Sequence, residues 1–325
     1  MAEDLVKNQH YVPQVYLRNF ANSKERIWVY DKEERNVFNA GVKNVACERF
    51  FYDSAEMEQV TGNRQFIEKQ LCGIEGKFCE ISRSLIKSLQ EGSFTVLKRR
   101  HRHFFSAYMV IQMLRTKESR LKTLQMTELM CAVLKKRHNE ACLMPLTDSE
   151  LLQGLTLEEA ARHIQSRTLL NASEIESLAN ILYRHVWVIQ EAFANDTFLT
   201  SDHPFSKRPH IRHAVRSMNG IASPGIEILF PLSPKYLLTL VDRHHFHHIQ
   251  LLDGSRICLD SHDEMIYCNQ FQIFDSNRFI FSTNDNFSLV EEVLRELPIF
   301  GNPDRKRIEC NRDNEIGRGG DLHKF

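Results

Sequence analysis

The stretch Ile67-Glu68-Lys69-Gln70-Leu71-Cys72-Gly73-Ile74-Glu75-Gly76-Lys77-Phe78-Cys79-Glu80-Ile81-Ser82-Arg83-Ser84-Leu85 has the regular pattern of an amphipathic helix. Its apolar residues recur at spacings of three and four, which gives the helix one continuous face for a core. Glu91-Gly92-Ser93 interrupts this pattern, and a second helix is predicted from about 97 to 138. Two long helices joined by a short turn are expected to pack antiparallel, so the centre of the fold is predicted to be a helical hairpin.

Short strands are predicted in the sequence that precedes these two helices. The stretch 26–31 alternates polar and apolar residues, and 36–40 follows the charged turn Lys32-Glu33-Glu34-Arg35. Such a pattern is typical of a β-hairpin. A third strand near 50–52 is expected to complete a small N-terminal sheet.

Shorter helices are predicted to follow the long ones. Pro145 ends the long helical unit, and two helices are expected at about 148–165 and 173–185. Ser173 and Glu176 have the spacing of a capping box at the start of the second.

The last third of the chain is predicted to be rich in strands and to end in helices. Its apolar runs are short and are bounded by Pro, Asp and Gly, which are typical strand boundaries. The predicted strands cover 185–190, 197–200, 227–230 and 236–240, and the closing helices cover about 264–282 and 288–296.

These elements together predict an α+β protein with a mostly antiparallel C-terminal sheet. A chain of 325 residues can form one elaborate domain or two smaller ones. We expect a single domain over 1–300, with the N-terminal motif and hairpin in 1–60, the helical part in 61–185 and the strand-rich part in 186–300. The stretch 301–325 is polar and is expected to be a flexible tail.

Composition argues against several broad classes of protein. Lys and Arg total 42, as do Asp and Glu, so no overall charge favours binding to nucleic acids or acidic ligands. The start of the chain carries acids and no apolar run, and no apolar stretch is long enough to span a bilayer. The eight cysteines form no Cys-x-x-Cys pair, which is typical of reduced thiols. The chain is therefore expected to be cytoplasmic, without a membrane partner.

The most specific motif is the segment His10-Tyr11-Val12-Pro13-Gln14-Val15-Tyr16-Leu17-Arg18-Asn19-Phe20. It resembles the signature of a widespread, mainly bacterial group, domain-of-unknown-function family 4238, whose members begin His-Tyr-x-Pro-Gln-x-Tyr-Leu-x-x-Phe. Three further stretches echo this family, and together they extend the resemblance over about 10–285. They are Ile67-Glu68 with Glu75, Gln112 with Arg115 and Thr116, and Ser201-Asp202-His203-Pro204 with Pro231-Leu232-Ser233. His203 departs from the pattern, where Asn is expected more often, and the family label implies no activity.

Pro13 is suited to the first turn of a helix, because it lacks the amide hydrogen and its φ is preset. His10 then lies just outside this turn, where it is a candidate general base, metal ligand or phosphate contact. Gln14 lies on the helix and is a candidate substrate-binding residue. The alternative is that the segment is a structural clamp whose aromatic residues dock it to the core.

The antiparallel arrangement of the two long helices predicts a polar strip beside their apolar seam. If the chain turns near residue 94, Glu75 lies abreast of Gln112 and Arg115, and Glu68 lies near Arg120. Glu75 is then a candidate catalytic residue or metal ligand, and Gln112 and Arg115 are candidates for holding a phosphate or carboxylate. The alternative is an ion pair that fixes the register of the helices.

The sequence Thr200-Ser201-Asp202-His203-Pro204 follows an apolar strand and is predicted to be a tight turn at its end. Loops in such positions often carry functional groups. Asp202 is a candidate general base or metal ligand and Ser201 a candidate substrate contact, and the alternative is an Asx turn. No Gly-x-Ser-x-Gly frame surrounds Ser201, so a hydrolase elbow is not predicted.

Two clusters of basic and histidine residues are also prominent. The run 242–248 contains four histidines, but their spacing does not fit a zincin, and a solvated connection is predicted. The cluster 99–103 lies at a helix start, where positive charge opposes the helix dipole, so it is a candidate to face an anion or an acidic neighbour, and the commoner alternative is a solvated face.

These residues lead to two competing hypotheses. The first is a hydrolase of phosphodiester bonds, assisted by a divalent metal, with nucleic acid or nucleotide as its partner. His10, Glu75 and Asp202 are its catalytic residues, and Gln14, Gln112, Arg115 and Ser201 bind the substrate. The second is a non-enzymatic protein, either a ligand sensor or a regulatory or defence-associated interaction protein, in which the same residues are structural.

Overall fold

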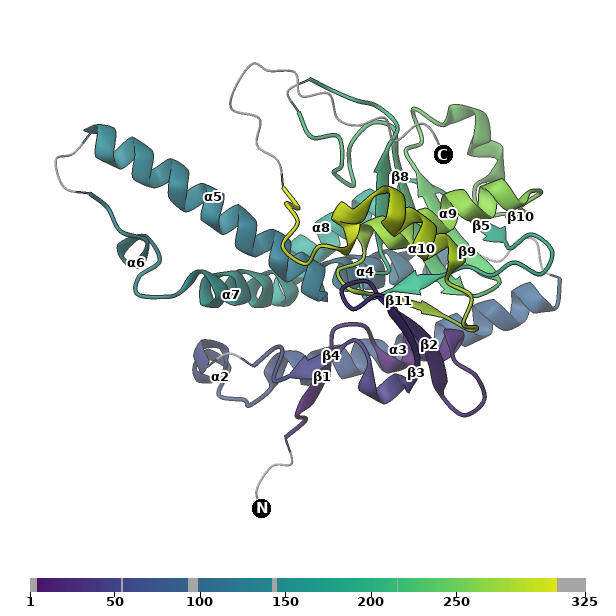
Figure 1. Ribbon diagram of the computed structural model, residues 1–325, viewed down its shortest axis with the longest axis horizontal. Coiled ribbons are helices and arrows are strands. Elements are labelled where there is room, and N and C mark those ends of the chain that lie inside the picture. Colours follow the sequence, from purple (N-terminus) through teal and green to yellow (C-terminus); the bar gives the residue numbers. More distant parts are fainter. Residues whose placement is uncertain (1–4, 54, 93–98, 142–144, 215, 309–325) are drawn as a thin grey trace.

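A five-stranded sheet with helices on both faces forms the centre of the computed structural model (Figure 1). The structure describes residues 5–53, 55–92, 99–141, 145–214 and 216–308. β10 pairs parallel with β5, and the other strands pair antiparallel. In spatial order the strands are β10 (Arg256–Cys258), β5 (Val186–Glu191), β9 (Tyr236–Val241), β8 (Ile226–Ser233) and β7 (Ser206–Pro209).

Alternation along the strands gives this sheet two apolar faces. Phe230 of β8 belongs to the main core with Phe78 of α3 (Phe66–Gln90) and Leu182 of α8 (Ala172–Tyr183). Its neighbour Leu229 points the other way and packs in a second cluster with Phe271 of α9 (His262–Asp275). Because successive side chains of a strand point to opposite faces, one strand contributes to both layers. The helical part and α9 therefore lie on opposite faces of the sheet.

The N-terminal hairpin forms part of a second, four-stranded sheet in the order β3-β2-β11-β6. The predicted hairpin is confirmed as β2 (Arg26–Asp31) and β3 (Asn36–Gly41). It pairs with β11 (Phe279–Ser282), which in turn pairs with the short β6 (Thr200–Ser201). The predicted helix over 264–282 is wrong at its end, because α9 stops at Asp275 and the apolar run Phe279-Ile280-Phe281 is a strand.

The motif segment begins with β1 (Asn8–His10), which pairs antiparallel with β4 (Cys47–Arg49). The predicted third strand near 50–52 is therefore wrong in place and partner, since the strand lies at 47–49 and does not join the hairpin. After Pro13 the chain forms the short α1 (Gln14–Leu17) and η1 (Arg18–Phe20), as the proline predicts. The turn η2 (Val42–Asn44) leads into β4.

The helical hairpin is present, but its second helix is broken. α3 is followed by α4 (Arg99–Arg115) and α5 (Lys117–Ala141), with the break at Thr116. The prediction of one helix over 97–138 is wrong there, because side chains from elsewhere in the fold bind the polar groups at the break. Gln165 Nε2 donates to the carbonyls of Leu114 (2.8 Å) and Thr116 (3.0 Å).

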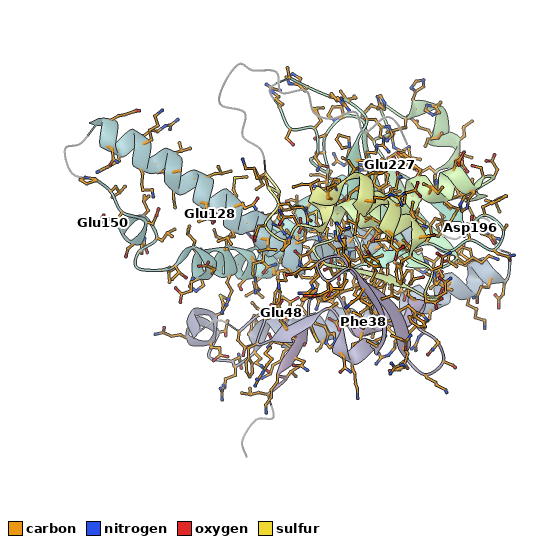
Figure 2. The ribbon with its side chains drawn as sticks, in the orientation of Figure 1. Phe38, Glu48, Glu128, Glu150, Asp196 and Glu227 are labelled. Atoms are coloured by element: carbon orange, nitrogen blue, oxygen red, sulfur yellow. The ribbon has the colours of Figure 1, made fainter. Side chains whose placement is uncertain are left out.

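Three helices extend away from the sheets as an arm on the left of Figure 1, and Figure 2 shows Glu128 and Glu150 on it. The arm consists of α5, α6 (Asp148–Leu151) and α7 (Leu157–Leu170). α6 and α7 start with complete capping boxes. The capping box predicted at Ser173 is wrong by two residues, because the side chain of Asn171 accepts the amide of Glu174 at the start of α8.

The remaining elements pack on different parts of the fold. They are α2 (Ala55–Thr61), η3 (His247–Leu252), α10 (Ser288–Glu296) and η4 (Pro298–Gly301). Gly301 to Ile308 fall within the stretch expected to be a flexible tail, yet Arg305 is buried, and Arg305 and Arg307 both form ion pairs with Glu118. The rest of that stretch, 309–325, lies outside the described residues. Within the described part of the chain, no helix is long and apolar enough to cross a membrane.

Candidate functional site

Arg115, the last residue of α4, is the centre of a buried polar cluster that we call the Arg115 centre. Its Nη1 donates to Glu75 Oε1 at 2.8 Å, its Nε to the Tyr52 hydroxyl at 3.1 Å, and its Nη2 to the carbonyl of His10 at 2.6 Å. Arg115 is 1% exposed. The structure thus places Glu75 beside Arg115, as the antiparallel geometry predicts, and ties both helices to the motif segment. The chemical roles of these residues stay predictions.

Glu68 lies two turns before Glu75 on α3 and belongs to the same centre. Burial raises the pKa of Glu68 to about 7; the charges of Glu75 and Asp53 raise it further, and Arg115 opposes the shift. Its Oε2 is buried and has no hydrogen-bond partner. A carboxyl group in this position is available as a proton donor near neutral pH.

The neighbour predicted for Glu68 was Arg120, but the guanidinium of Arg120 binds elsewhere. Its Nε donates to Gln165 Oε1 at 2.7 Å and its Nη2 to the carbonyl of Phe51 at 2.8 Å. It also stacks on the Phe51 ring, 3.5 Å from the ring centroid. No carboxylate among the described residues forms an ion pair with Arg120, so its positive charge is not neutralised by a direct partner.

The imidazole of His10, whose backbone carbonyl binds Arg115, has one unpaired nitrogen. The side chain is 8% exposed, and Nε2 is buried without a hydrogen-bond partner. Burial lowers the pKa of His10, Glu75 opposes this change and Arg115 adds to it. The ring is therefore neutral near pH 7, and a neutral imidazole nitrogen can accept a proton.

Two further buried polar atoms near Arg115 have no partner. Gln112, one turn before Arg115, donates from Nε2 to the carbonyl of Tyr11 at 3.1 Å, but its Oε1 is unpaired. The Tyr108 hydroxyl is also unpaired. In the described part of the chain, four unpaired buried atoms thus belong to residues around Arg115: Gln112 Oε1 lies one turn before it, and the side chains that carry His10 Nε2, Glu68 Oε2 and Tyr108 OH interact electrostatically with both Arg115 and Glu75. Buried polar groups normally have partners, so this concentration marks a place for water or a ligand.

Solvent reaches this region along α3. The Glu75 side chain is 20% exposed, and Cys72, one turn from both Glu68 and Glu75, is exposed. Local burial and the two neighbouring carboxyl groups raise the pKa of Cys72, so this thiol is a poor nucleophile. The chemistry available here is proton transfer and hydrogen bonding rather than attack by a thiolate.

Most contacts of the motif segment attach it to the rest of the fold. The Tyr16 hydroxyl lies 2.7 Å from Thr200 Oγ1 and donates to the carbonyl of Pro231 at 2.8 Å, which ties α1 to two strands. Gln14 Oε1 accepts a hydrogen bond from Arg18 Nη2 at 3.3 Å. No hydrogen bond joins the Gln14 side chain to the Arg115 centre in the described residues, so its predicted role in substrate binding has no contact to support it.

Asp202 is buried and fully engaged with the backbone. Its carboxylate accepts the amides of Asn277 (2.8 Å), Arg278 (2.8 Å) and Phe279 (2.9 Å), which fixes the turn between α9 and β11. Burial raises the pKa of Asp202, and these three amides oppose the shift. In the residues that the structure describes, it forms no hydrogen bond or ion pair with His10, Glu75 or Arg115.

Ser201 and His203, on either side of Asp202, belong to the same buried turn. Ser201 Oγ donates to Gln272 Oε1 at 2.8 Å and accepts the amide of His203 at 3.2 Å. His203 Nδ1 lies 2.6 Å from the hydroxyl of Thr116, the residue after Arg115. The Ser201–His203 turn therefore contacts Thr116, the residue that follows Arg115. Its polar atoms bind partners outside the Arg115 centre.

Sequence reasoning missed a second group of buried charges near this turn. Lys32 Nζ donates to the carbonyls of Ile273 (3.0 Å) and Ser276 (2.9 Å), and burial lowers the pKa of Lys32 to about 7. Glu118 accepts from Arg305 at 3.1 Å and from Arg307 at 2.9 Å. The sequence predicts Lys32 in a charged turn and the two arginines in a tail, and no spacing in the sequence signals their burial.

The two basic and histidine clusters have ordinary structural roles. The Asp242 carboxylate accepts the amides of His244 (3.3 Å) and His245 (3.1 Å), which shapes the exposed connection after β9. Arg102 pairs with Asp253, which is the acidic neighbour expected for the cluster 99–103. No group of three or more His, Cys, Asp or Glu side chains that could hold a metal occurs in the part of the chain that the structure describes.

The fold and the site define an α+β protein with a buried polar cluster at the junction of its motif segment and helical hairpin. The family model described as "Protein of unknown function (DUF4238)" matches residues 8–286. The chain belongs to this family, as the motif resemblance indicates. No curated protein and no solved structure matches it.

Proposed function

We propose that the chain is a hydrolase whose active site is the Arg115 centre. The observation that supports this most directly is the group of four unpaired buried polar atoms around Arg115. Two of them belong to groups whose proton affinities suit opposite roles: a neutral imidazole at His10 and a carboxyl at Glu68 with a pKa of about 7. Pairs of titratable groups whose environments separate their pKa values are typical of acid–base catalysis.

The proposed reaction is hydrolysis of a phosphodiester by proton transfer. His10 Nε2 accepts a proton from a water molecule as its oxygen forms the new bond to phosphorus. The protonated carboxyl of Glu68 gives its proton to the leaving oxygen as the old P–O bond breaks. Glu75 holds Arg115, and Gln112 Oε1 accepts a hydrogen bond from the water or substrate. A second proton exchange with solvent restores both groups.

The anionic substrate class rests on two arginines that both act on the Tyr52 hydroxyl. Arg115 has one carboxylate partner, Glu75, and Arg120 has no described ion-pair partner. Burial raises the pKa of the Tyr52 hydroxyl, and the charges of both arginines lower it. Both arginines therefore contribute positive potential at this place. Arginine is well suited to phosphate recognition because its planar donors match phosphate oxygens.

A divalent metal remains part of the hypothesis only as an added component. The described residues offer no group of three ligands, so the steps above pass through protons of the protein's own side chains. Assays with and without added Mg²⁺ or Mn²⁺ measure whether a metal contributes.

The test is hydrolysis of bis(p-nitrophenyl) phosphate and of a dinucleotide by purified protein. His10→Ala and Glu68→Gln are each expected to lower kcat by 100-fold or more, which is the scale of a lost general acid or base. Activity is expected to fall as pH rises through about 7, because Glu68 loses its proton there. His244→Ala and Glu80→Gln, both exposed, are the matched controls and should keep full activity.

Retention of activity in both His10→Ala and Glu68→Gln contradicts the proposed centre. Wild-type protein with no hydrolysis of either substrate, with or without metal, favours the second candidate, a non-enzymatic ligand-sensing or interaction protein. One observation supports that candidate: the polar side-chain groups of Tyr16, Ser201 and Asp202 are already hydrogen-bonded to other parts of the fold.

A further inference from the structure

A cavity of about 220 Å³ lies between the edge strand β7, helix α9 and η4, and none of its lining residues belongs to the Arg115 centre. It combines an aromatic wall with two consecutive cationic residues, Lys207 and Arg208. The aromatic wall consists of Phe271, Phe274 and Phe300. Such a combination of apolar surface with a few polar groups is typical of a small-molecule site.

The guanidinium of Arg208 is held in place by rings and leaves its donors free. It lies 4.7 Å from the ring centroid of Tyr267 and 5.6 Å from that of Phe271. In the residues that the structure describes, no oxygen accepts a hydrogen bond from it and no carboxylate pairs with it. A stacked guanidinium with free N–H groups is preorganised for an anion, because little side-chain freedom is lost on binding.

The carboxylate nearest to Arg208 in the sheet register is bound to other groups. Glu227 of β8, labelled in Figure 2, is the register partner of Arg208. Its Oε2 accepts from the Tyr267 hydroxyl at 2.6 Å and lies 2.7 Å from His210 Nε2. Glu227 therefore does not form an ion pair with Arg208, although it lies on the neighbouring strand.

Lys207 also lines the cavity, but its side chain points to the opposite face of β7 from Arg208, because successive residues of a strand alternate. Its Nζ donates to the carbonyl of Asn219 at 2.8 Å, and no described carboxylate lies within ion-pair distance. Asp275 also lines the cavity, but its carboxylate accepts the backbone amide of Lys207 at 2.8 Å. Burial and the neighbouring Lys122 lower the pKa of Lys207 to about 8, against the attraction of Asp275. Arg208 is therefore the cationic group of this cavity, and the Asp275 carboxylate, which the amide of Lys207 binds, is its acidic group.

The aromatic wall provides a surface for a flat ring. Phe274 and Phe300 have ring centroids 4.6 Å apart at an interplanar angle of 37°, and both are partly exposed. Aromatic rings pack favourably in offset or tilted arrangements, and a nucleobase presents such a face. The amide of Gln270 beside them can bind the polar edge of a base.

We propose that this cavity binds a nucleoside monophosphate, with the base on Phe274 and Phe300 and the phosphate on Arg208. The site is separate from the Arg115 centre, and the proposal does not depend on the hydrolase function, because it is tested by binding.

The experiment is isothermal titration of the full chain with AMP, adenosine and inorganic phosphate at low ionic strength. AMP is expected to bind at least 10-fold more tightly than either adenosine or phosphate, because it alone uses both halves of the cavity. Arg208→Gln should weaken AMP binding by roughly 10-fold or more. Phe274→Ala should weaken AMP and adenosine together. Arg49→Gln is the matched control, since Arg49 also stacks on a phenylalanine, 5.9 Å from the ring centroid of Phe50, but lines no part of this cavity.

The proposal is overturned if the wild-type chain binds none of the three ligands, or if Arg208→Gln, verified as folded by circular dichroism, binds AMP as the wild type does. Phosphate binding equal to AMP binding also overturns it, because the aromatic wall then contributes nothing. Arg208→Lys covers the case in which the glutamine variant does not fold: it keeps the charge, and it should retain part of the AMP affinity while losing the two-point contact of guanidinium with phosphate. Unchanged affinity in that variant contradicts the assigned role of Arg208.

Discussion

Burial shifts the pKa values of Glu68 and His10, the two central groups of the Arg115 centre, in opposite directions. It disfavours the charged form of both, so Glu68 holds its proton up to about pH 7 while His10 is without one. The sequence predicted His10, Glu75 and Arg115 for this site. It did not single out Glu68 as an acid, because its unusual pKa arises from burial beside Glu75 and Asp53, and no sequence pattern records that.

Glu68 makes the stability of the protein depend on pH. Its folded-state pKa of about 7 is above the unfolded value near 4.3, so the folded state binds more protons and stability falls as pH rises from about 4 through 7. Glu68→Gln removes this ionisation and is expected to be more stable than the wild type by roughly 2 to 4 kcal/mol at pH 8, with little difference at pH 4. Urea unfolding at both pH values measures this. Equal stability of the two proteins at pH 8 contradicts the raised pKa.

Asp202 is expected to matter for stability rather than for chemistry. Asp202→Ala leaves three buried amides without an acceptor, so it should lower the free energy of unfolding by roughly 3 kcal/mol or more. Thermal unfolding measures the loss. If the folded fraction of Asp202→Ala loses hydrolysis as His10→Ala does, with no change in stability, the assignment of Asp202 as a structural residue is wrong.

At the scale of elements, local patterns predicted what lies within one helix or hairpin and failed where distant segments meet. The core stripe of α3, the β2–β3 hairpin and α10 were predicted correctly, since each is specified by its own period. The sequence predicts a helix at the position of β11, because a short apolar run fits either structure. The run forms a strand because it pairs with β2. The break at Thr116 contains no Gly or Pro, so nothing local predicts it.

The break between α4 and α5 is expected to depend on Gln165. Its amide donates to two carbonyls at the break, and its Oε1 accepts from Arg120. Gln165→Leu leaves these groups buried without partners and should cost about 2 to 4 kcal/mol of stability. Gln153→Leu, at an exposed loop position, is the control. A loss below 0.5 kcal/mol in Gln165→Leu, measured by chemical denaturation, contradicts this account of the break.

At the scale of the whole molecule, the chain closes on itself through buried ions rather than through its apolar core alone. Residues 301–308 return to the start of α5, where Arg305 and Arg307 meet Glu118. Lys32 of the N-terminal hairpin and Arg305 both donate to the carbonyl of Ser276. The N-terminal hairpin, the helical arm and the C-terminal segment are thus joined at the end of α9, although they are far apart in the sequence.

This junction predicts a large and specific effect of Arg305. Arg305→Met leaves the carboxylate of Glu118 with one partner fewer and removes donors from the carbonyls of Ser276 and Asn277. Breaking one side of a buried ion pair typically costs 3 to 5 kcal/mol, so the variant should show a marked fall in Tm. Lys306→Met changes the adjacent, exposed cation and should shift stability by less than about 0.5 kcal/mol. Equal effects of the two substitutions mean that the segment is not held by its buried ions.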